Sequence, residues 1–97
     1  MKEIVQDRYG NTIYLTDERW NHIVERHSEF KDHKGEVVGA IRSGKRKQDS
    51  LHPDIFYYVR AIRHIPSEHT HIKVVVAFRM TSERPNNFVV TAFPISE

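Results

Sequence analysis

The sequence predicts an α+β domain, with an N-terminal hairpin and two helices packed on a mostly antiparallel four-stranded sheet. The first half of the chain has two segments in which apolar residues recur at helical spacing. The second half has three segments rich in β-branched and aromatic residues, and no helix separates them. We therefore expect these strands to pair antiparallel, with the helices on one face of the sheet.

Length and composition predict one domain over residues 1–97, with 38% hydrophobic and 29% charged residues. No apolar run is long enough to span a membrane, and the N-terminal residues lack a signal pattern, so we expect a cytoplasmic protein with no membrane partner. Cysteine is absent, which excludes disulfides and thiol chemistry. The net charge of +2 permits nucleic-acid binding without requiring it.

The hairpin and the first helix follow from turn and capping signals. Residues 2–7 and 12–15 are expected as short strands joined by a glycine-containing turn. Thr16 is a suitable N-cap, and acidic residues follow it in the first turn, where the helix dipole favours negative charge. The sequence therefore predicts a helix over residues 17–30.

The remaining elements are a second helix and three strands. The helix is expected over residues 35–43 with its stop at Gly44, and a polar, basic connection is expected over residues 45–50. The strand segments read IFYYVRAI, IKVVVAFRM and FVVTAFP. They are expected at residues 55–62, 72–80 and 88–94.

Four polar residues stand in apolar surroundings. The helix stripe that begins at Trp20 reaches His27 at i+7, and the three strands contain Arg60, Lys73 and Thr91. Each has an ordinary structural explanation, such as a hydrogen-bonded core histidine or a residue on the solvent face of a strand. Because a helix packed across a sheet directs its stripe toward that sheet, we expect all four to meet in one cleft.

Such a set suits cleavage of a phosphodiester without a metal or other cofactor. Histidine transfers protons near neutral pH, while lysine and arginine offset the charge that develops on the phosphate oxygens. With RNA the substrate supplies its own nucleophile, the 2′-hydroxyl, so the protein has only to position it and transfer protons.

Three parts of the sequence also carry a family resemblance. The helix LTDERWNHIVERHSEF, the segment HPDIFYYVR, and the pair IKVVVAF and FVVTAFP resemble the phage-type branch of the barnase–EndoU–colicin–RelE superfamily of small ribonucleases and toxins. The similarity covers about residues 15–94. It implies helices followed by a four-stranded antiparallel sheet, and metal-independent endoribonuclease activity that leaves 2′,3′-cyclic phosphate ends.

The resemblance also implies site residues and partners. It points to Arg26 and His27 in the Glu-Arg-His motif, and to the same Arg60, Lys73 and Thr91. Tyr58 is a further candidate for base stacking or proton transfer. Ser28 departs from the family, which often has proline after the histidine. Members cut RNA, so RNA is the expected substrate. Many are toxins held inactive by an antitoxin or immunity protein, which is then the expected partner, and others are domains of larger phage or mobile-element proteins.

The basic cluster after the second helix has two interpretations. Arg42, Lys45, Arg46 and Lys47 form either a solvated loop, in which the helix C-terminus favours cations, or a contact for the RNA backbone. The second interpretation makes Lys45, Arg46 and Lys47 substrate-binding residues.

Two other classes of protein remain open. In the first, His64, His69 and His71 contribute to a metal site, although three or four converging ligands are needed and only a loose group is visible. In the second, the domain is a non-catalytic RNA-binding or protein-interaction module, and Phe56, Tyr57 and Tyr58 stack bases on a sheet surface without cleavage. Substitution of His27 distinguishes a pure binding module from a nuclease that uses this histidine.

Overall fold

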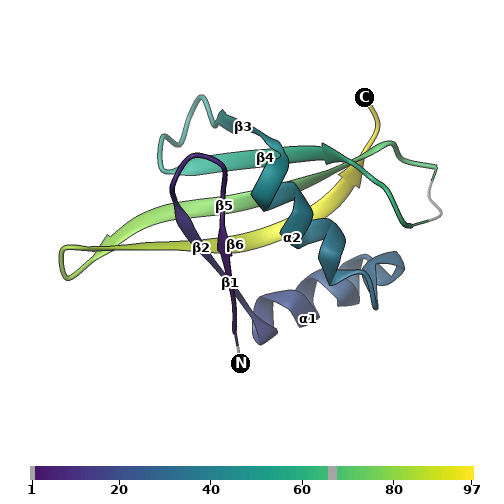
Figure 1. Cartoon of the computed structure of the whole chain (residues 1–97), viewed down its shortest axis with the longest axis horizontal. Helices are drawn as coiled ribbons and strands as arrows, with labels where there is room; N and C mark the ends of the chain where they lie inside the picture. The colour runs from purple at the N-terminus through teal and green to yellow at the C-terminus, as the bar shows by residue number, and fades with distance from the viewer. Residues whose placement is uncertain (1, 66–67) are drawn as a thin grey trace.

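Six strands and two α-helices follow one another in the computed structural model, which describes residues 2–65 and 68–97 (Figure 1). The α+β class is confirmed. The elements, in chain order, are β1 (Lys2–Gln6), β2 (Thr12–Thr16), α1 (Asp17–Arg26), the 3-10 turn η1 (Ser28–Phe30), α2 (Lys34–Ser43), β3 (Lys45–Gln48), β4 (Ile55–Ala61), β5 (His71–Thr81) and β6 (Arg84–Ile95).

The sheet is larger than the sequence predicted. All six strands form one sheet in the order β1-β2-β6-β5-β4-β3, and the predicted four-stranded antiparallel sheet is wrong in its number of strands. The N-terminal hairpin joins this sheet through a short parallel pairing of β2 with β6, at Ile13 with Asn87 and Tyr14 with Phe88. The Asn87 side chain strengthens this junction, because its amide donates a hydrogen bond to the Thr12 carbonyl at 3.2 Å.

The basic segment after α2 is a strand and not only a connection. Lys45 to Gln48 form β3, which pairs antiparallel with β4 at the edge of the sheet. Charged residues are common on edge strands, because they discourage pairing with another chain. The three later strands are confirmed as an antiparallel β4-β5-β6 meander. Residues 66 and 67, between the predicted strands 55–62 and 72–80, lie outside the described residues.

The first helix is shorter than predicted. It begins at the expected N-cap, where the Thr16 hydroxyl accepts a hydrogen bond from the Arg19 N–H at 3.2 Å, but it ends at Arg26 and not at Phe30. His27 is the C-cap, with φ −134° and ψ 77°, and the 3-10 turn that follows buries Phe30 completely. The chain thereby reverses toward α2, so His27 leaves the helical stripe of which it was expected to be part.

One face of the sheet carries the core. Ile23 of α1 and Val37 and Ile41 of α2 are buried in a single cluster with residues of the central strands. Figure 1 shows α2 crossing the near side of these strands. The strand residues of this covered face are Tyr58, Arg60, Ile72, Val74, Val76, Val89 and Ala92.

The opposite face of the sheet has no helix over it among the described residues. Side chains of successive strand residues alternate between faces, so the neighbours of the buried residues point to this side. We call it the open face, and its residues on the central strands and β3 include Lys45, Lys47, Ile55, Tyr57, Val59, His71, Lys73, Val75, Phe88, Thr91 and Phe93. No described helix is long and apolar enough to cross a membrane.

Candidate functional site

The residues predicted to meet in one cleft lie on opposite sides of the sheet. Arg60 pairs with Ile72 and points to the covered face. Lys73 and Thr91 point to the open face, Lys73 opposite Val59 and Thr91 opposite Val75. The expected convergence of the four residues is therefore wrong, because neighbouring positions on a strand face opposite ways.

Arg60 has a structural partner on the covered face. Its Nη2 donates to Glu36 Oε1 of α2 at 3.3 Å, and only 15% of its side chain is exposed. The guanidinium lies directly against Gly39, where a Cβ would come within 2.0 Å of Arg60 Nη1. Glu36 also accepts a hydrogen bond from the His64 N–H at 2.7 Å. Arg60 and Glu36 thus connect α2 to the end of β4.

His27 and Arg26 lie at the end of α1. Arg26 is exposed, and the His27 side chain is 31% exposed, with its Nδ1 3.9 Å from Glu29 Oε1. The His27 ring tilts against Phe30, with ring centroids 6.3 Å apart. Neither residue lines the two clefts described below.

Tyr58 is fully buried, so the structure contradicts its predicted role in stacking a base. Its hydroxyl donates to Asp7 Oδ2, and burial together with this hydrogen bond raises the Tyr58 pKa above its usual range. Burial raises the pKa of Asp7 as well, but hydrogen bonds from Tyr58, Asn11 and Tyr9 outweigh it and hold this pKa below its ordinary value. Asp7 is therefore a buried carboxylate that fixes the hairpin to β4.

Arg46 also points to the covered side. Its guanidinium lies 4.0 Å from Asp7 Oδ2 and 4.4 Å and 4.7 Å from the ring centroids of Tyr9 and Phe56. Cation–π contacts and the nearby carboxylate thus hold it in place. Its neighbours Lys45 and Lys47 point to the open face, and neither forms an ion pair within residues 2–65 and 68–97.

On the open face, a second group of polar residues gathers near the middle of the sheet. Lys73 Nζ lies 4.2 Å from the centroid of the Tyr57 ring. The Tyr57 hydroxyl donates to Asp49 Oδ1, and this hydrogen bond raises the pKa of Tyr57 above its ordinary value. Thr91 is the diagonal neighbour of Lys73 on β6, and the two residues of such a pair are about 7–8 Å apart. The ring, the ammonium and the hydroxyl therefore share one surface.

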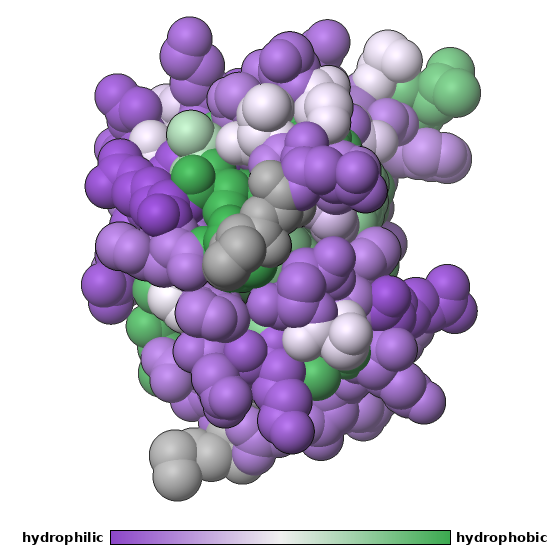
Figure 2. Space-filling model, turned by 90° about the vertical axis from the view of Figure 1, so that its right-hand side faces the viewer, coloured by the Kyte–Doolittle hydropathy of each residue, from purple (hydrophilic) through white to green (hydrophobic). Residues whose placement is uncertain are grey.

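A basic cleft of about 640 Å³ opens beside β3, close to the C-terminal end of α2. Its charged lining comes from several elements: Arg8, Lys45, Arg46, Lys47, Arg60, His71 and Glu97. Five of these side chains are permanent cations. The end of the molecule that carries the C-terminus presents a mostly hydrophilic surface (Figure 2).

His71 is the histidine of this cleft. It begins β5, two residues before Lys73, so both side chains point to the open face. His71 Nδ1 lies 2.7 Å from Thr70 Oγ1, which accepts a hydrogen bond from the Glu97 N–H at 2.9 Å. Nε2 lies 3.9 Å from Glu97 Oε2. The imidazole is thus oriented on one side by a hydroxyl and faces a carboxylate on the other.

The sequence predicted His71 only as a possible metal ligand, although the alternating pattern around it indicates its place on the strand. HIKVVV alternates buried Ile72 and Val74 with the polar pair His71 and Lys73, which is the period-2 pattern of a half-buried strand. Across the described part of the chain, no three His, Asp or Glu side chains lie close enough together to hold a metal ion.

Comparisons of the chain with known protein families, curated proteins and solved structures found no match. The resemblance to small ribonucleases and toxins, and the expected antitoxin partner, therefore remain predictions.

Proposed function

We propose that the open face binds single-stranded RNA and cleaves it without a metal ion, with His71 as the proton carrier. The observation that carries this proposal is the alignment of His71 with Lys73 on β5, beside a cleft lined by further cations. Lysines on this face supply the positive charge that a phosphodiester backbone requires. Tyr57 offers a flat ring on which a base stacks.

The cleavage follows from the residues of this face. The substrate 2′-oxygen bonds to phosphorus while the bond from phosphorus to the 5′-oxygen breaks. His71 accepts the proton of the 2′-hydroxyl, and a water molecule supplies a proton to the departing 5′-oxygen. The hydroxide that remains takes the proton back from the imidazolium, which restores neutral His71. Glu97, 3.9 Å from Nε2, stabilises the imidazolium that forms. Lys73, the next residue along β5 on the same face, stabilises the charge on the phosphate oxygens.

The test is cleavage of a labelled mixed-sequence RNA in excess EDTA, with DNA of the same sequence as control. We expect RNA products with 2′,3′-cyclic phosphate ends and intact DNA. His71→Gln should lower the cleavage rate by about 100-fold or more, because a proton carrier contributes that much. His27→Gln is the matched control, since this partly exposed histidine lies outside the cleft, and it should leave the rate within about twofold.

Two outcomes overturn the proposal. If His71→Gln folds and cleaves at the original rate while His27→Gln does not, the proton carrier is His27. If the original protein binds RNA but does not cleave it, the open face belongs to a non-catalytic RNA-binding module. The partly exposed rings of Tyr57 and Phe93 on this face favour that second function.

A further inference from the structure

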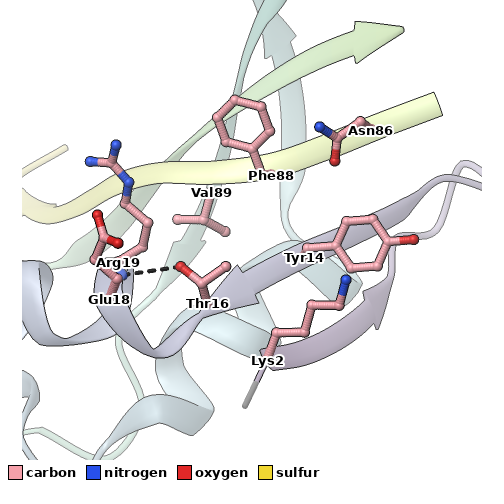
Figure 3. Close-up of a pocket in the computed structure, with 8 residues that line it drawn as sticks. All are labelled: Lys2, Tyr14, Thr16, Glu18, Arg19, Asn86, Phe88 and Val89. Carbon is pink, nitrogen blue, oxygen red and sulfur yellow. Dashed lines mark hydrogen bonds between the residues drawn. The ribbon is translucent and has the colours of Figure 1, made fainter. Parts of the chain in front are cut away.

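A second pocket, of about 300 Å³, lies at the far side of the open face (Figure 3). It forms beside the short parallel pairing of β2 with β6, which joins only Ile13 with Asn87 and Tyr14 with Phe88. Tyr14 and Phe88 alternate with the buried residues Ile13 and Val89, so both rings point to the open face. Both rings therefore lie on the same face of the sheet as His71 and Lys73.

The chemistry of this pocket suits a nucleotide. Tyr14 and Phe88 provide two aromatic walls, and Lys2 Nζ lies 4.2 Å from the Tyr14 ring centroid. Arg19 enters from the first turn of α1 and forms no ion pair with any described residue. Asn86 presents an amide, which can both donate and accept hydrogen bonds at a base edge (Figure 3). Rings, cations and an amide are groups that recognise a base, a phosphate and a base edge. The Glu18 carboxylate also lines the pocket, so its contents favour a base over a phosphate.

The volume of the pocket limits what it can hold. About 300 Å³ is at the lower end of the range for small-ligand sites, which fits one nucleotide and excludes a duplex. A base enters such a pocket only when it is unpaired and unstacked. The expected ligand is therefore a base of a single strand.

The separation of the two sites sets the length of that strand. Phe88 pairs with Ala77 of β5, and the distance along β5 from His71 to Ala77 is about 20 Å at about 3.4 Å per residue. Tyr57, Val75 and Thr91 lie on the open face between these two ends. The path is thus continuous and carries one further aromatic ring.

We propose that the Tyr14–Phe88 pocket binds a nucleobase of the RNA strand whose scissile phosphate lies at His71, several nucleotides away. This inference rests on the proposed RNA binding by the open face. It makes the protein selective for single strands long enough to reach both sites. A shorter oligonucleotide binds only in the cleft around His71 and does not reach the pocket.

The test measures binding of 2′-O-methyl oligoribonucleotides, which cannot be cleaved, by fluorescence anisotropy. A trinucleotide and a decanucleotide are compared on the original protein and on Phe88→Leu, which removes the ring but keeps an apolar side chain. We expect Phe88→Leu to weaken the decanucleotide about tenfold and to leave the trinucleotide unchanged, because one base–aromatic stack is lost. Leu51→Ala, at an exposed apolar side chain that lines neither the pocket nor the cleft, should change neither affinity.

The outcomes separate this inference from the proposed nuclease. Equal affinities of Phe88→Leu and the original protein for the decanucleotide overturn the second site, even where RNA cleavage is observed. A selective loss of decanucleotide affinity without any cleavage supports the second site and overturns the nuclease. If neither oligonucleotide binds, both proposals are wrong.

Discussion

The two faces of the sheet hold the same kinds of side chain under opposite conditions. On the covered face, Arg60 lies beside Glu36 and Arg46 beside Asp7. On the open face, Lys45 and Lys73 have no carboxylate partner within the described ranges. A charge removed from water needs a compensating partner, whereas a charge at the surface stays available to a ligand. The difference indicates that the cations of the covered face stabilise the fold, whereas those of the open face are available to a ligand.

The largest expected effect is on the covered face. Arg60→Met should lower the free energy of unfolding by about 2–4 kcal/mol, because the buried Glu36 carboxylate loses its cation. Chemical denaturation of the variant measures this. Adding Glu36→Gln to Arg60→Met should restore part of the loss. An Arg60→Met variant as stable as the original protein contradicts a structural role for Arg60.

The corresponding change on the open face should affect activity and leave stability unchanged. Lys73→Met should lower kcat/KM for RNA by about 100-fold, because a cation near the reacting phosphate is lost. Its unfolding free energy should change by less than about 0.5 kcal/mol, as for most surface substitutions. If Lys73→Met destabilises the protein as much as Arg60→Met does, the two faces do not differ in the way described.

On the covered side, acid should act through Asp7. The pKa of Asp7 is lowered in the fold, so its carboxylate adds stability above the unfolded pKa, and this is lost as the pH falls through the folded pKa. Unfolding free energies measured between about pH 6 and pH 2 should therefore decrease on acidification. Asp7→Asn should be less stable at neutral pH and should show a shallower decrease. An unchanged slope in this variant assigns the acid sensitivity to other carboxylates.

The smallest effect concerns salt. Each phosphate contact to a single strand contributes about 0.7 to the slope of log affinity against log salt concentration. Lys45→Ala should reduce this slope by about that amount, since Lys45 points to the open face. Gln48→Ala, at a neutral residue of the same strand, should leave the slope unchanged. If Lys45→Ala and the original protein give equal slopes, Lys45 does not contact the RNA.

The sequence located several residues of the candidate site but not their arrangement. Lys45, Lys47, Lys73 and Thr91 do lie together on the open face. Tyr58 and Arg60 were predicted for the same site because the sequence does not show to which face of the sheet a strand side chain points. The sequence predicts a strand that begins at Ile72, one residue after the true start of β5, and so it does not place His71 on the same face as Lys73.

Local sequence alone determined the α+β class, the start of the first helix at Thr16 and the antiparallel order of the last three strands. Those features depend on capping, periodicity and short connections, which act between near neighbours. Tertiary structure decided the parallel contact of β2 with β6, the end of α1 at Arg26 and the face to which each strand residue points. A shift of one residue in a strand reverses its faces, so only packing against the helices determines which cations are buried and which meet a ligand.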